Sequence, residues 1–171
     1  KADGDEARHL VRQVARHRVA MDGVSELLLR LAESNPAVVP AAVEQLARES
    51  TPPAQAVKFL TNVVKDAKSS AAMRAQGVTA LAKLDSLDAL TGAWEGLRGL
   101  ANDSQATAEF DAARQAWLAS PHLARHVEAL SKWSSSGDKD QAVGADAALT
   151  AIVVGTGGSA EARLAAQQAL E

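Results

Sequence analysis

The sequence predicts an all-α fold, in which about nine or ten short antiparallel helices stack in pairs as a right-handed superhelix. The first of three observations is composition, because 38 of the 171 residues are alanine, the strongest helix former. Strand-forming residues do not alternate with polar ones, which argues against a sheet. The third observation is a regular series of polar helix starts and short turns, which makes neighbouring helices antiparallel.

Polar capping residues mark the start of each expected helix. Asn35-Pro36 combines an N-cap with a proline at the first helical position. The ring of Pro40 would clash with the carbonyl four residues back, so this helix is expected to begin nearer Val39. The other expected starts are Asp3 in a capping box with Glu6, Thr51-Pro52, Ser69 or Ser70, Ser86, Asp103 or Ser104, and Ser120-Pro121, followed by helices over 139–154 and 159–170.

Each expected helix carries apolar residues three and four positions apart, which gives it one face for the core. The expected core stripes are Leu10, Val11, Val14 and Ala15; Val24, Leu27, Leu28 and Leu31; Val57, Leu60, Val63 and Val64; Met73, Val78, Leu81 and Leu84; Leu87, Leu90, Trp94, Leu97 and Leu100; Phe110, Ala113, Trp117 and Leu118; and Leu123, Val127, Leu130 and Trp133.

Alternate helices recur at a nearly constant interval. They are expected to begin near positions 22, 52, 86 and 121, which are 30, 34 and 35 residues apart. A period of this size built from helix pairs is typical of an α-solenoid. An irregular bundle of the same helices is the alternative. We expect one domain over residues 1–171, excised from a larger chain because it begins at Lys1 without a Met.

A short phrase recurs in the second helices of the expected pairs. Residues 73–81 read Met-Arg-Ala-Gln-Gly-Val-Thr-Ala-Leu, residues 162–170 read Ala-Arg-Leu-Ala-Ala-Gln-Gln-Ala-Leu, and residues 110–118 are a looser copy. The phrase resembles the second helix of HEAT repeats. The resemblance implies a HEAT-like solenoid in which the second helices, with Arg74 and Arg114, line the binding surface.

The whole chain is also similar in style to the HEAT-like regions of large secreted proteins of planctomycetes and verrucomicrobia. Those proteins join a sugar-dehydrogenase-like propeller, helical repeats and a c-type haem domain. The resemblance implies a periplasmic or secreted location and a spacer or docking role between working domains. The haem attachment motif Cys-x-x-Cys-His is absent, as is every cysteine, so this segment would not itself carry the haem.

Charge and composition exclude several classes of partner. The chain has 18 Lys and Arg against 21 Asp and Glu, a net charge of −3, which is too balanced to indicate nucleic acid or an anionic membrane. It has no run of about 18 apolar residues, so no membrane span is expected. The lack of cysteine excludes disulfides, thiolate zinc sites and a cysteine nucleophile.

A glycine-rich segment near the end of the sequence resembles a nucleotide-binding motif. Residues 155–160 read Gly-Thr-Gly-Gly-Ser-Ala after an apolar run, which matches the G-x-G-x-x-A form of the dinucleotide fingerprint. That fingerprint needs a preceding strand and an acidic residue about 20 positions on. Residues 142–149 instead read as helix, and the sequence stops at Glu171. We therefore interpret Gly155–Ser159 as an interhelix turn in which Ser159 is an N-cap.

Two histidines have the spacing of metal ligands. His122 and His126 lie four positions apart on one expected helix, which places them on one face. The metalloprotease motif would need Glu at position 123, where this chain has Leu, and no third ligand is apparent, although Glu128 or Asp138 could lie near. Asp138-Lys139-Asp140 begins like a calcium loop, but positions 142, 143 and 149 do not continue it. We expect no metal site.

Basic and aromatic residues are the remaining candidates for binding. Arg8, Arg12 and Arg16 form a row that suits phosphate or an acidic partner, but a solvated helix face is the preferred interpretation. No aromatic residue lies between them to stack on bases. Trp94 and Trp117 have core spacing. Trp133 has it too, although an exposed interface anchor is the alternative for this residue.

These observations predict a non-catalytic scaffold or protein-interaction module, which spaces or docks the domains of a larger protein. No nucleophile elbow and no paired carboxylates are present, so we expect no enzyme activity and no catalytic, cofactor-binding or metal-binding residues. The expected partner is another protein or a neighbouring domain, with no cofactor and no small-molecule substrate. The alternative is a docking segment of a haem-containing, sugar-dehydrogenase-like redox protein, itself without cofactor.

Overall fold

The structure is a computed structural model that describes residues 24–135, 137, 139–155 and 158–171, and every regular element in this part of the chain is a helix. The all-α prediction is confirmed for these residues. The expected first helix, with Asp3, Glu6 and Arg8, lies outside them. The elements are α2 (Val24–Ser34), η1 (Pro36–Val38), α3 (Val39–Arg48), α4 (Ala56–Lys65), α5 (Ala71–Leu81), α6 (Leu87–Ala101), α7 (Thr107–Leu118), α8 (Leu123–Ser134), α9 (Lys139–Val154) and α10 (Ala160–Leu170).

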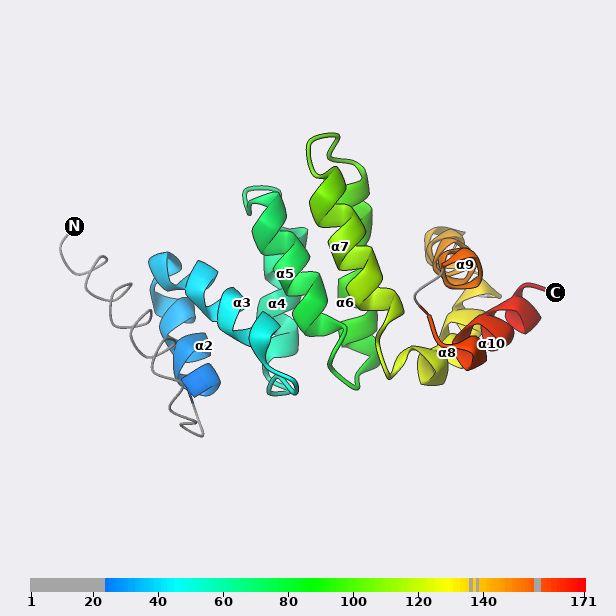
Figure 1. Ribbon diagram of the computed structural model, residues 1–171, viewed down its shortest axis with the longest axis horizontal. Coiled ribbons are helices and arrows are strands. Elements are labelled where there is room, and N and C mark those ends of the chain that lie inside the picture. The colour runs from blue at the N-terminus through cyan, green and yellow to red at the C-terminus, as the bar shows by residue number, and fades with distance from the viewer. Residues whose placement is uncertain (1–23, 136, 138, 156–157) are drawn as a thin grey trace.

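The helices pack mainly against near neighbours in the sequence. α4, α5 and α6 contact one another, α3 and α7 each pack on α5, and α8, α9 and α10 form a second mutually packed group. Figure 1 shows α2 to α7 side by side along the longest axis of the molecule, with α8, α9 and α10 grouped at one end. None of the described helices is long and apolar enough to cross a membrane.

Three predicted serine caps are confirmed. The side chains of Ser70, Ser86 and Ser159 accept hydrogen bonds from the backbone N–H three residues on, at 3.3, 3.4 and 3.1 Å. Each bond satisfies one of the amides that a helix start leaves without a partner. The expected late start of α3 is also confirmed, because Asn35 caps the short η1 and the regular helix begins at Val39.

Three helices begin later than expected, and one of them is α8, which begins at Leu123 with His122 as its N-cap instead of at Ser120-Pro121. α4 begins at Ala56 instead of Pro52, because the second proline, Pro53, disfavours helical geometry at the residue before it. α7 begins at Thr107, and neither Asp103 nor Ser104 caps it. The carboxylate of Asp103 is instead held by the Arg74 guanidinium at 2.7 Å. That partner lies 29 residues earlier, where local capping rules do not reach.

The expected core stripe of α2 is wrong in phase. Leu27 and Leu31 are 56% and 40% exposed, whereas Leu28 and Leu29 are buried. A run of four leucines within five residues fits the helical spacing in two phases, and the structure uses the one that begins at Ser25. The buried hydroxyl of Ser25 is satisfied by a hydrogen bond that it donates to a Glu49 carboxylate oxygen.

Glycines bring α4, α5 and α6 unusually close together. A Cβ on Gly77 would lie 2.7 Å from Cγ1 of Val64, and one on Gly96 would lie 2.7 Å from Cγ2 of Val78 and 2.8 Å from Cβ of Val64. Real Cβ atoms essentially never approach so closely. The three helices therefore form a tight unit, and α6 presents its opposite side to the groove described next.

Candidate interaction groove

A groove runs along α6 and is completed by α7, α8 and α9. It consists of two cavities of ≈ 290 and ≈ 390 Å³ that meet at Trp94 and Arg98. Around those two shared residues, the first cavity is lined by Leu90, Thr91, Glu95, Trp117, Leu130, Trp133, Gly144 and Ala145. The second is lined by Leu97, Ala101, Phe110, Arg114, Ala147, Thr150, Ala151 and Val154. The walls are therefore mainly aromatic and aliphatic, with polar side chains from Thr91, Glu95, Arg98, Arg114 and Thr150.

Trp94 and Trp117 form a tilted aromatic pair in the wall of the first cavity. Their ring centroids are 5.2 Å apart and their planes meet at 35°. Trp117 is completely buried and Trp94 partly buried. Both indole Nε1 atoms are buried without a hydrogen-bond partner in the described part of the chain, which is unusual because buried N–H groups are normally paired. Both donors are out of contact with solvent, so neither is offered to the cavity.

Arg98 lines both cavities. It lies four residues after Trp94 on the same face of α6, and its Nη1 is 3.8 Å from where a Cβ of Gly144 would lie on α9. The guanidinium therefore lies close to α9 at Gly144. Arg98 is exposed and has no ion-pair partner among the described residues. Within the described part of the chain, its charge is therefore not compensated by an ion pair.

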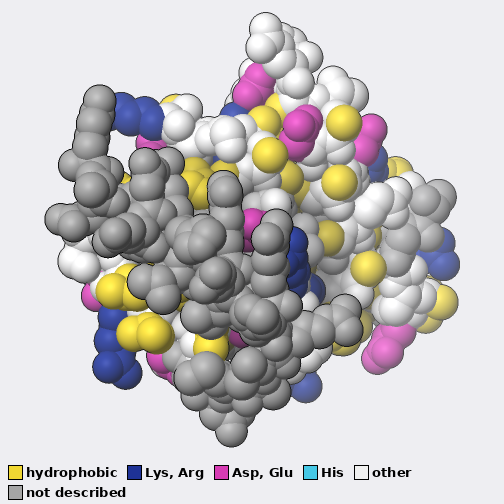
Figure 2. Space-filling view, turned by 60° about the vertical axis from the view of Figure 1, so that its left-hand side comes forward, with side chains coloured by type: hydrophobic (Ala, Val, Ile, Leu, Met, Phe, Trp, Pro, Cys, Tyr) yellow, Lys and Arg dark blue, Asp and Glu magenta, His cyan; other side chains and the backbone are white. Residues whose placement is uncertain are grey.

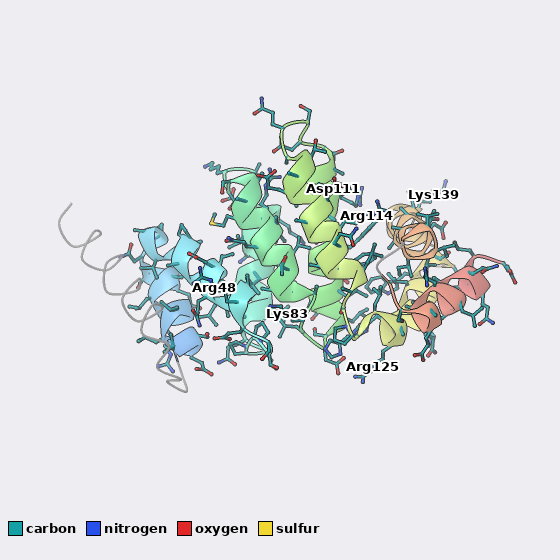
Figure 3. All side chains as sticks on the ribbon, in the orientation of Figure 1. Arg48, Lys83, Asp111, Arg114, Arg125 and Lys139 are labelled. Carbon is teal, nitrogen blue, oxygen red and sulfur yellow. The ribbon has the colours of Figure 1, made fainter. Side chains whose placement is uncertain are left out.

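Arg114 lies on the edge of the second cavity. It is partly buried on α7, and Figure 3 shows it on the side of that helix nearest α9. It too lacks an ion-pair partner among the described residues. Arg114 is one of the two arginines that the HEAT-like phrase assigns to a binding surface.

Arg74, the other arginine of that phrase, has a different role. It is only 9% exposed, and its guanidinium donates to the Gly99 carbonyl at 3.3 Å and to Asp103 at 2.7 Å. These bonds tie α5 to the C-terminal end of α6. The expectation that Arg74 belongs to an exposed binding surface is therefore wrong, because its charge is already satisfied within the fold.

The three tryptophans were all expected at core spacing, and the structure brings them to one cavity. Trp133 is partly buried on α8 and lines the first cavity together with the Trp94–Trp117 pair. Its partial burial is intermediate between the two interpretations of Trp133 from the sequence, which were a buried core residue and an exposed interface anchor. Arg98 was not identified as a candidate, although its four-residue spacing from Trp94 was a readable signal.

His122 and His126 meet a carboxylate that sequence spacing did not reveal. Asp85 Oδ1, in the turn before α6, lies 3.6 Å from Nδ1 of His122 and 3.7 Å from Nε2 of His126, and Arg125 pairs with the other oxygen. Burial lowers the pKa of His126, although the Asp85 carboxylate opposes this; the charges of His122 and Arg125 lower it further. Among the described residues no three ligands are grouped to hold a metal ion. These contacts connect α8 to the turn between α5 and α6.

The glycine-rich segment follows a helix and not a strand. The residues before it form α9, which ends at Val154. A Cβ on the buried Gly155 would lie 2.6 Å from Cδ1 of Leu118 and 2.8 Å from the Ala151 carbonyl oxygen, so close packing explains this glycine. Ser159 caps α10 as expected, while positions 156, 157 and Asp138 lie outside the described residues.

Charges of both signs are mixed on the surface. Figure 2 shows Lys, Arg, Asp and Glu side chains scattered among hydrophobic ones on the part of that face that the undescribed residues leave open. The two arginines of the groove are therefore a local feature of a chain whose net charge is −3.

No family model, curated protein or solved structure matches this chain. The function proposed below therefore rests on the geometry and chemistry of the groove.

Proposed function

We propose that this domain is a non-catalytic protein-interaction module of helical repeats, and that the groove along α6 is its partner-binding site. The observation that carries the proposal is the combination of aromatic walls with two arginines that have no ion-pair partner in the described chain. Residues that dominate binding energy at protein interfaces are enriched in Trp and Arg and lie in pockets that exclude water.

The packing of the helices supports the repeat architecture. In the described chain each helix packs chiefly on the next helix or the next but one, as expected when successive helix pairs stack. Scattering in solution tests the arrangement, because a compact domain of this length would have a radius of gyration of about 15–16 Å. A HEAT-like solenoid should give a clearly larger value, and a value within that range would contradict it.

The partner-binding site can be tested by filling it. Ala147 is exposed on α9 and lines the second cavity, so Ala147→Trp should block the groove without disturbing the core. Ala112 is exposed on α7 and lines neither cavity, so Ala112→Trp is the matched control. Circular dichroism would confirm that both variants are folded.

The probe is a random peptide library displayed on phage and selected against the full chain. We expect the enriched peptides to bind the Ala147→Trp variant at least about tenfold more weakly than the parent chain, a difference of about 1.4 kcal/mol in binding free energy. They should bind the Ala112→Trp variant as tightly as the parent chain. Fluorescence anisotropy of the synthesised peptides gives both dissociation constants. Peptides that bind both variants equally, or a selection that enriches none, would overturn the assignment of the groove.

A further inference from the structure

The groove has an excess of positive charge that is available to a partner. Glu95 is the only carboxylate among the described residues that line the two cavities, and its Oε2 lies 2.6 Å from Nζ of Lys65. Its charge is therefore already compensated. Arg98 and Arg114 remain, both lining the second cavity and without ion-pair partners among the described residues. The groove is thus complementary to a negatively charged partner.

The size of the cavities suits large side chains. The volumes of ≈ 290 and ≈ 390 Å³ leave room for one large apolar side chain in each cavity. A partner segment that lies over the groove can therefore place one such side chain in each cavity.

Resting on the function proposed above, we infer that the groove is specific for an acidic peptide segment with two large apolar side chains. The apolar side chains fill the two cavities against Trp94 and Phe110. Carboxylates beside them pair with Arg98 and Arg114, where guanidinium groups form charge-assisted hydrogen bonds. Recognition of acidic motifs by arginine clusters is a common mode of peptide binding.

The specificity can be tested with synthetic fluorescent peptides. The probe carries two leucines, set at several spacings, with glutamate at the other positions, and its two twins carry glutamine or lysine in place of glutamate. The Glu peptide should bind the full chain at least about tenfold more tightly than the Gln twin, and its affinity should fall as ionic strength rises. The Lys twin should bind most weakly.

Charge reversal provides the matched variants. The double variant Arg98→Glu/Arg114→Glu should reverse the order, so that the Lys twin binds more tightly than the Glu peptide. Arg30→Glu, an equal charge change at an exposed site on α2, should leave the order unchanged. Circular dichroism checks that the variants are folded, and the exposure of Arg98 makes a folding defect unexpected.

The outcomes separate this inference from the function on which it rests. If Gln and Glu peptides bind equally and Ala147→Trp weakens both, the groove binds peptides but acidic specificity is wrong. The same holds if library-selected peptides bind in the groove and no Glu peptide does. If Ala147→Trp leaves every affinity unchanged, the peptides bind elsewhere and the proposed function fails as well.

Discussion

Gly77 provides a direct test of the close packing between α4 and α5. In an open helix, Gly→Ala stabilises by about 1 kcal/mol because alanine is the better helix former. At Gly77 the new Cβ would lie 2.7 Å from Cγ1 of Val64, a β-branched side chain that is only 2% exposed and has little room to move. Overpacking of this kind costs about 1–3 kcal/mol. We place Gly77→Ala in the upper half of that range.

The expected net effect of Gly77→Ala is a loss of about 1–2 kcal/mol in the free energy of unfolding, or about 2–8 °C in Tm for a chain of this size. Gly99→Ala is the matched control on α6, where the nearest atom to the new Cβ is Nη1 of Arg74 at 3.7 Å. This ordinary contact leaves only the gain in helix propensity, so the variant should be more stable than the parent by up to about 1 kcal/mol.

Urea unfolding followed by circular dichroism measures both variants, and a double-mutant cycle with Val64→Ala locates the clash. Val64→Ala removes Cγ1, so the methyl of Gly77→Ala would then fill the space left behind. The loss in the free energy of unfolding of the double variant should be smaller than the sum of the two single-variant losses by about 1–3 kcal/mol. The close approach of α4 and α5 at Gly77 would be refuted if Gly77→Ala and Gly99→Ala changed the free energy of unfolding equally. It would also be refuted if the losses of Gly77→Ala and Val64→Ala simply added in the double variant.

Three further predictions concern buried side chains. Trp117→Ala should cost about 3–5 kcal/mol in urea unfolding, because a completely buried ring is removed; a loss below 1 kcal/mol would contradict its place in the core. Arg74→Met should cost about 1–2 kcal/mol, a discounted value because Asp103 is 36% exposed and can be rehydrated; an unchanged urea midpoint would show that the pair contributes nothing. Because burial lowers the pKa of His126 below 6.5, the unfolded chain takes up its proton first as the pH falls below 6.5, and stability should drop there. His126→Gln should show a smaller drop, and a slope equal to that of the parent would exclude this residue as the cause.

The sequence predicts a helix correctly where the interactions that start the helix are between residues close in the sequence. Ser70, Ser86 and Ser159 cap the helices that their spacing indicates, because an N-cap bonds to an amide only three residues on. The start of α7 was not predictable in this way, since Asp103 is held by Arg74 from a different helix. The leucine run of α2 was ambiguous because two phases satisfy the same spacing.

The groove was only partly predictable for the same reason. Trp94, Trp117 and Trp133 could each be placed on the inner face of a helix from spacing alone. Their meeting at one cavity depends on how α6, α7 and α8 pack, which spacing within a helix does not specify. Asp85 is the clearest omission, because it approaches His122 from a turn that carries no motif.

The preference of each helix for near neighbours has a consequence for how the chain reaches its native state. The most distant side-chain hydrogen bond among the described residues, between Arg125 and Asp85, spans 40 positions of a 171-residue chain. Low contact order of this kind is associated with fast folding, because little loop-closure entropy is lost before contacts form. The helices can therefore assemble progressively as they leave the ribosome, each onto a surface that is already complete.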